Sequence, residues 1–246
     1  MLNSPRIAQA LLLPLFLWEI VSLLLKAGRH RFWYDELLTL QVSALHPDTL
    51  WKALRAGVDG MPPGYYAIVK LARMLPLDPH VTLRVPSIAG YLLTLIGVYC
   101  FARKRLAVLP AAVAVLLLSL SPFRAFALEA RSYALLVGFV AISLCLWQRA
   151  EDKRYMTPLL GLFLMLAVAC HHLAVIVLGC FGAAELAWSF VTRRVRRGCG
   201  PLSWWRHLPF AVSVPLLIRY REIYGNTFWA PSQWWGSRPP IGSIWV

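Results

Sequence analysis

Charged residues are scarce in this chain. Only 15% of the 246 residues are Asp, Glu, Lys or Arg, whereas 59% are hydrophobic, and the mean hydropathy is +0.60. Soluble proteins average about 25% charged and about 45–50% apolar residues, so the composition excludes an ordinary soluble domain. Because long apolar segments cross a bilayer as helices, the sequence predicts an all-α, polytopic membrane protein built as a helical bundle.

Patterns that form disulfides or bind zinc are also lacking. The five cysteines lie in or beside apolar segments, and no Cys-x-x-Cys or Cys/His spacing occurs, which argues against a disulfide framework and a structural zinc site. The first apolar segment has no small-residue cleavage site, so we expect a membrane span rather than a signal peptide. It contains Glu19, which we expect to face the bundle and pair with a basic residue that the sequence does not identify.

Acidic residues are outnumbered, with 11 Asp and Glu against 25 Lys and Arg and a formal net charge of +14. In a soluble protein this excess would favour nucleic-acid binding. Here the basic residues gather between apolar segments, as expected for the cytoplasmic loops of a membrane protein, and we expect no nucleic-acid partner. The three clusters are Arg103-Lys104-Arg105, Arg149 with Lys153-Arg154, and Arg193-Arg194 with Arg196-Arg197.

About seven apolar segments are candidates to cross the hydrocarbon core, which takes about 20 helical residues. We expect these segments to lie in the cell inner (plasma) membrane; alternating them from a cytoplasmic N-terminus puts all three basic clusters on the cytoplasmic side. It leaves the loop 28–84 and the aromatic, proline-rich tail 219–246 outside. A transporter proper is disfavoured, because no inverted repeat of hydropathy is visible. The segments are Ile7–Ala27, Val85–Ala102, Leu106–Leu120, Tyr133–Trp147, Met156–Cys170, Leu173–Val191 and Ser203–Ile218.

The outside loop 28–84 carries helical patterns of its own. Apolar residues recur at helical spacing on both sides of His46-Pro47 and again from Tyr65 to Leu75. Asp48 and Asp78 are expected N-caps of the helices that follow them. We therefore expect amphipathic helices that lie on the outer membrane surface.

Ionisable side chains that are unusual in a membrane protein all fall on this predicted outer side. An Asp-Glu pair, Asp35 and Glu36, follows three aromatic residues just beyond the first span; a solvated loop start is the simpler alternative. Near membrane depth, charges are costly and are usually paired or functional, although interfacial snorkelling is an alternative for Glu129 and Arg131. Together these side chains predict a cavity at the outer leaflet. They are Asp35, Glu36, Glu129, Arg131, His171 and His172.

Four motifs follow one another along the chain: Tyr34-Asp35-Glu36; Met61-Pro62-Pro63-Gly64-Tyr65-Tyr66; Leu83-Arg84-Val85-Pro86-Ser87; and Ser121-Pro122 with Leu128-Glu129-Ala130-Arg131-Ser132-Tyr133-Ala134. In this order they resemble membrane glycosyltransferases of the GT-C superfamily. In particular, they are similar to the bacterial family 39-like branch of protein O-mannosyltransferases and aminoarabinose (lipid A) transferases. Met61 stands where these relatives usually carry His. The resemblance covers nearly all of residues 1–246, which we expect to form one catalytic module without the C-terminal spans of the full family fold.

The resemblance implies transfer of a sugar, with inversion, from a polyprenyl phosphate donor to an extracytoplasmic protein, lipid or glycan, among membrane lipids. Asp35 and Glu36 would be catalytic, Asp35 as the base and Glu36 orienting the acceptor. Arg131 would bind the donor phosphate, together with Glu129 and Arg84, and Glu129 would hold Arg131 or a cation. Glu36 and Glu129 are also candidate ligands of a divalent cation, the one cofactor suggested. The substrates would be lined by Tyr34, Tyr65, Tyr66, Tyr133, His171 and His172.

The residue types suit this chemistry without the resemblance. A carboxylate can take the proton of an acceptor hydroxyl, and Arg offers a planar, always-charged fork that matches phosphate oxygens. The leaving phosphate is already an anion of low basicity, so no general acid is required. The alternative is a non-catalytic membrane protein, either a lipid-binding or transport component or a truncated partner subunit.

Overall fold

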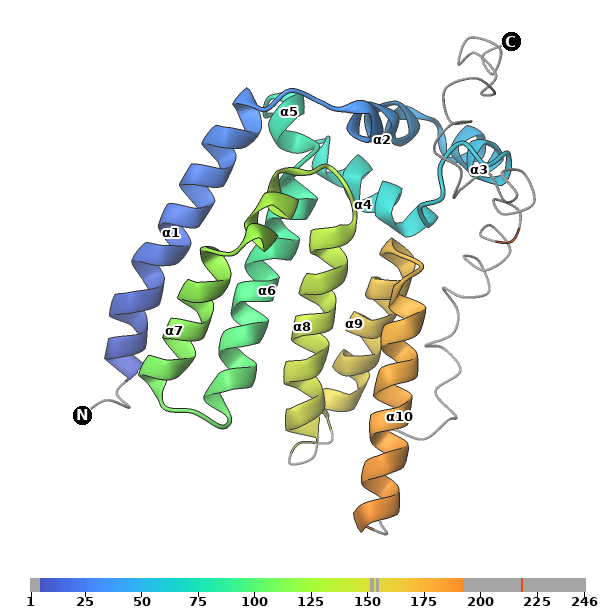
Figure 1. Ribbon diagram of the computed structural model, residues 1–246. Helices are drawn as coiled ribbons and strands as arrows, with labels where there is room; N and C mark the ends of the chain where they lie inside the picture. The colour runs from blue at the N-terminus through green and yellow to red at the C-terminus, as the bar shows by residue number, and fades with distance from the viewer. Residues whose placement is uncertain (1–4, 151–152, 154, 193–217, 219–246) are drawn as a thin grey trace, which may run out of the picture.

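The computed structural model describes residues 5–150, 153, 155–192 and 218. Every regular element within these residues is helical, which confirms the predicted class. Figure 1 shows long helices side by side, with shorter helices from the loop after the first one lying across one end. The elements are α1 (Pro5–Arg29), α2 (Tyr34–Ala44), α3 (Pro47–Arg55), α4 (Pro63–Ala72), α5 (Pro79–Thr82), α6 (Val85–Arg103), α7 (Val108–Ser119), the 3₁₀ helix η1 (Pro122–Leu128), α8 (Tyr133–Ala150), α9 (Met156–Cys170) and α10 (Ala174–Thr192).

Four helices in the described residues are long and apolar enough to cross a membrane: α1, α6, α8 and α10. A fifth span results if α7 and η1, which meet at a bend of 63°, are counted together, and α9 is apolar but shorter. The first six predicted segments match observed helices to within three residues at each end. The predicted Ser203–Ile218 lies outside the described residues except for Ile218, so the count of seven is not reached here.

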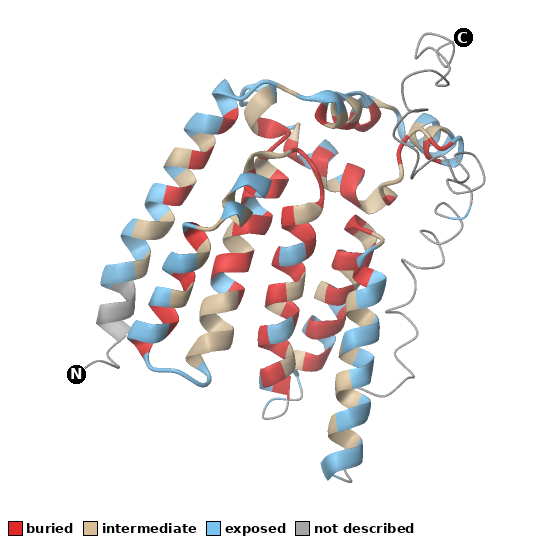
Figure 2. Cartoon of the chain, viewed as in Figure 1, coloured by how far each residue is buried: buried red, intermediate tan, exposed pale blue. Residues whose placement is uncertain are grey.

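Close packing of α6 on α8 forms the centre of the bundle. A Cβ added at Gly90 would come within 2.4 Å of the backbone of Leu135, and one at Gly138 within 2.4 Å of Gly90. At Gly97 a Cβ would come within 2.6 Å of the backbone of Ala141. Lipid tails are as apolar as Leu, so membrane helices associate through such close contacts of small residues. Figure 2 shows the buried residues concentrated along α6, α8 and α9, while α10 is largely exposed.

The predicted helices of the first loop are present as α2 to α5, hereafter the cap. Asp78 is the N-cap of α5, and its carboxylate accepts a hydrogen bond from the His80 amide at 2.7 Å. The prediction that Asp48 is the N-cap of α3 is wrong. The N-cap is His46, two residues earlier, so Pro47 is the first residue of α3, where its missing N–H costs nothing.

Glu19 in α1 has the basic partner that the sequence did not identify. The Arg124 Nε donates to the Glu19 carboxylate at 2.8 Å, and its Nη2 donates to the Ser22 hydroxyl at 2.6 Å. Because Glu19 is only 3% exposed, this pairing compensates a charge that burial would otherwise make costly. The pair joins α1 to η1.

Candidate active site

Arg131, in the connection between η1 and α8, is the centre of a polar cluster beneath the cap. Its Nη1 donates to the Asp59 carboxylate at 3.0 Å and to the Thr39 hydroxyl at 3.4 Å, while its Nη2 lies 3.9 Å from the Asp35 carboxylate. The Thr39 hydroxyl in turn donates to the backbone oxygen of Asp35. Segments that are far apart in the sequence therefore converge on one guanidinium: α2, the chain before α4, and the chain before α8.

One edge of the Arg131 guanidinium is hydrogen-bonded, and the other, which we call the open edge, has donors without acceptors in the described residues. Its Nε, though buried, has no hydrogen-bond acceptor in the described residues, and the only acid near Nη2 lies beyond hydrogen-bonding distance. Nε and Nη2 form the side-on fork that binds two oxygens of a phosphate. Burial by itself would lower the pKa of Arg131, but Asp59 and Asp35 raise it, so the group keeps its charge. The geometry suits an anion with two oxygens.

Asp59, which the sequence reasoning missed, holds the anchored edge. Its side chain is buried, and it accepts hydrogen bonds from the Tyr66 hydroxyl and from Arg131 on the same oxygen. Burial raises the pKa of the Tyr66 hydroxyl, and the Asp59 carboxylate raises it further, so Tyr66 remains a neutral donor. The sequence could have identified Asp59 by its position, because it is an acid two residues before Met61-Pro62 in a chain with few acids.

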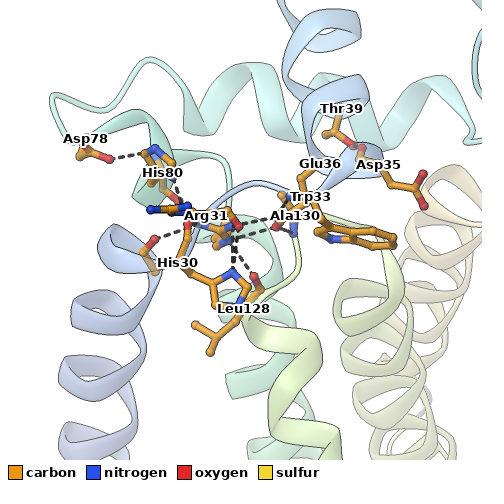
Figure 3. A network of polar contacts seen from close by, with 12 residues as sticks. His30, Arg31, Trp33, Asp35, Glu36, Thr39, Asp78, His80, Leu128 and Ala130 are labelled. Atoms are coloured by element: carbon orange, nitrogen blue, oxygen red, sulfur yellow. Dashed lines mark hydrogen bonds and ion pairs between the residues drawn. The ribbon is translucent and has the colours of Figure 1, made fainter.

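Asp35 and Glu36 are adjacent in α2 but lie in different environments. The Asp35 side chain is 33% exposed and Glu36 is completely buried. Figure 3 shows Glu36 turned into a network of polar contacts and Asp35 turned away from it. Within this acidic pair, Asp35 is therefore the accessible carboxylate.

Glu36 and Arg84 form a saturated ion pair in which neither side chain is exposed. Arg84 Nη2 donates to Glu36 Oε2 at 2.7 Å and Nε to Oε1 at 3.1 Å, while the Ala130 amide donates to Oε1 at 2.7 Å. The same Nε also donates to the backbone oxygen of Leu128 at 2.7 Å, and Nη1 donates to that of Ala27 at 2.9 Å. This geometry gives no support to a catalytic Glu36 or a phosphate-binding Arg84, because both are enclosed and already paired.

Two more of the predicted lining residues carry buried polar atoms without partners. The Tyr65 hydroxyl and the His171 Nε2 join Arg131 Nε as three of the five such atoms in the described residues. Burial strongly raises the pKa of Tyr65 and lowers that of His171 to about 4, the latter helped by His172 and Arg131. His171 is therefore neutral at pH 7. Its Nδ1 accepts from the Leu173 amide at 3.0 Å, so Nε2 carries the hydrogen and is a donor.

The other predicted residues lie around this cluster in different ways. The Tyr133 ring packs on His171 with centroids 5.3 Å apart, whereas Tyr34 is 45% exposed on α2. Burial lowers the pKa of His172, which the Gly60 backbone opposes. Glu129 makes no ion pair in the part of the chain described, so Asp59 and Asp35 take the place predicted for it beside Arg131. Burial, with Glu36 and Asp35 nearby, raises the pKa of Glu129.

The residues present do not fit the suggested divalent cation. Both carboxylate oxygens of Glu36 already accept hydrogen bonds from Arg84, whose charge repels a metal ion. Among the described residues, no group of three or more His, Cys, Asp or Glu side chains is arranged to hold a metal. The surroundings of Glu36 and Glu129 therefore do not suit a divalent cation.

Comparison with known proteins identifies a family for this chain. The family model described as dolichyl-phosphate-mannose-protein mannosyltransferase matches residues 60–201. This range includes Arg84, Arg131 and His171 and begins just after Asp59. No curated protein and no solved structure gives a significant match.

Proposed function

Since the chain belongs to the dolichyl-phosphate-mannose-protein mannosyltransferase family and is thus an integral membrane glycosyltransferase of the GT-C type, we propose that it moves a sugar from a polyprenyl phosphate donor to an extracytoplasmic acceptor with inversion. The four ordered motifs support the bacterial branch that resembles protein O-mannosyltransferases and aminoarabinose transferases. The proposed orientation has the N-terminus in the cytoplasm and the cap on the outer face of the inner membrane, with residues 1–246 acting as one catalytic module.

The open edge of Arg131 is the observation that carries this proposal. A side-on guanidinium fork in a buried setting is suited to the phosphate of a lipid-linked sugar, because charge-assisted bidentate bonds are the strongest of their kind. Asp59 and Tyr66 hold the opposite edge, so the fork is oriented before the donor arrives. Tyr65 and His171 are neutral and offer further hydrogen-bond donors to the same anion, while Arg131 supplies the positive charge.

Asp35 is the proposed base of the transfer. Its carboxylate removes the proton of the acceptor hydroxyl while that oxygen attacks the anomeric carbon of the sugar. The bond from this carbon to the phosphate oxygen breaks, and the phosphate leaves with the electron pair to be stabilised by Arg131. Asp35 suits this role because it is accessible and near Arg131 but not hydrogen-bonded to it. Glu36 and Arg84 hold α2 in place rather than contact the substrate.

The test is transfer by the full chain in proteoliposomes from a radiolabelled polyprenyl phosphate mannose to acceptors extracted from envelope membranes. Asp35→Asn keeps the side-chain shape but removes the base, and we expect a loss of kcat of about 10²-fold or more with donor binding retained. Asp48→Asn, an exposed acid on α3, is the matched control and leaves kcat unchanged. Equal transfer by Asp35→Asn and wild type would remove Asp35 from the mechanism. Donor binding without transfer by the wild type would favour the non-catalytic alternative.

A further inference from the structure

A groove at the end of α1 nearest the cap is distinct from the candidate active site. It has a volume of about 270 Å³ and is lined by Leu25, Lys26, Arg29, His30 and Leu128. These residues come from the last turn of α1, the chain that follows it, and the end of η1. None of them belongs to the proposed transfer machinery.

Unpaired positive charge distinguishes this groove. Lys26 and Arg29 are both exposed, and their side chains have no hydrogen-bond or ion-pair partner in the described residues. By contrast, Arg84, Arg124 and Arg131 all have carboxylate partners. The end of a helix stabilises such cations only weakly, so their charge remains available to an anion.

An apolar wall accompanies the charge. Leu25 is 60% exposed and Leu128 is half-buried. Because α1 is apolar enough to cross a membrane up to Arg29, its last turn is expected at the boundary between lipid and water. Basic side chains beside exposed apolar ones at this depth match a phospholipid, which has an anionic phosphate directly above its acyl chains.

The two walls of the groove are held together by one buried side chain. Arg84 donates to the backbone oxygens of Ala27 and His30, each at 2.9 Å, on one wall and to that of Leu128 at 2.7 Å on the other. Figure 3 shows His30 and Leu128 meeting in this network. A ligand would therefore bind a preformed groove and avoid the cost of ordering it.

We propose that this groove binds the phosphate headgroup of an anionic membrane phospholipid, with Lys26 and Arg29 as its ligands. The site is separate from the donor phosphate at Arg131. Simple snorkelling of the two cations toward water is the competing explanation, and it predicts no preference among lipid headgroups.

Native mass spectrometry of the full chain in detergent micelles tests the proposal. Phosphatidylglycerol is titrated against phosphatidylcholine of the same acyl chains, and inorganic phosphate is added in a separate series. We expect adducts with phosphatidylglycerol in preference to phosphatidylcholine. Lys26→Ala/Arg29→Ala should weaken phosphatidylglycerol binding roughly 25-fold, about fivefold for each charge.

A matched control is present in α3, where Lys52 and Arg55 form an exposed pair with the same spacing in the last turn. Lys52→Ala/Arg55→Ala changes the net charge equally and should leave phosphatidylglycerol binding within twofold of wild type. Lys26→Arg/Arg29→Lys keeps both charges and should also bind. Equal losses from the two alanine pairs, equal binding of both lipids, or full displacement by millimolar inorganic phosphate would each overturn the lipid site.

Discussion

Two buried arginines, each beside carboxylates, lie under the same cap and differ in one respect. Arg84 is completely enclosed, and its donors reach Glu36 and several backbone oxygens. Arg131 is held at one edge by Asp59, while its Nε–Nη2 edge has no acceptor within hydrogen-bonding distance in the described residues. Charge and burial alone would make these residues equivalent. Their remaining hydrogen-bonding capacity separates them: the donors of Arg84 are used within the protein, whereas Arg131 keeps two donors for the anion that we propose it binds.

The largest expected effect comes from breaking the saturated pair. Glu36→Ala leaves the Arg84 charge buried without its carboxylate, which we expect to cost about 3–5 kcal/mol of stability. Thermal unfolding in detergent measures the loss. The control is Asp35→Ala, the accessible neighbour, which should change stability by less than about 1 kcal/mol. Equal losses from the two variants would show that Glu36 is not the structural member of the pair.

Lowering the pH should reduce the stability of the folded protein through His171. Burial holds its folded pKa at about 4, whereas the unfolded chain has a value near 6.5, so between these pH values the unfolded state binds the extra proton. Stability is unaffected by His171 above pH 6.5 and falls as the pH drops toward 4, by up to about 3 kcal/mol. His171→Asn removes this titration. Its unfolding temperature should fall less than that of wild type between pH 7 and pH 4, and an equal fall would contradict the assignment.

Removing the Asp59 charge that holds Arg131 should have a smaller effect. Asp59→Asn keeps the hydrogen bond but removes the charge that holds Nη1, and we expect kcat/KM for the lipid donor to fall about tenfold, mainly through KM. Asp59→Glu should restore part of the loss. The measurement is the transfer assay, with Asp48→Asn as the control. A pure loss of stability with unchanged KM in the folded fraction would make Asp59 structural only.

The long helices were predictable because their apolar segments are continuous and local. The ion pairs between distant segments were not predictable. Arg124 is 105 residues from Glu19, and Arg131 is 72 residues from Asp59, so only tertiary packing brings them together. Sequence alone also could not establish which of Asp35 and Glu36 faces inward. That choice depends on Arg84, 48 residues further along the chain.

The sequence placed the candidate site residues on one side of the membrane, but it did not give the contacts between them. The sequence predicted that Asp35, Arg131 and His171 fall on one side, and the structure brings Asp35 and Arg131 to 3.9 Å. The sequence analysis expected Glu129 to hold Arg131, whereas in the structure Asp59 forms the hydrogen-bonded ion pair with this arginine. Adjacency in sequence predicts contact poorly where the backbone turns, as it does between η1 and α8.

The most direct measurement is the affinity for polyprenyl phosphate mannose, by calorimetry in detergent, of two matched variants: Arg131→Lys and Arg84→Lys. Lysine keeps the charge but loses the planar fork. We predict that Arg131→Lys stays folded and binds the donor at least about tenfold more weakly. Arg84→Lys should lose stability, while its folded fraction binds the donor as wild type does. Normal donor binding by Arg131→Lys, or weakened binding by folded Arg84→Lys, would contradict the distinction between the open and the saturated arginine.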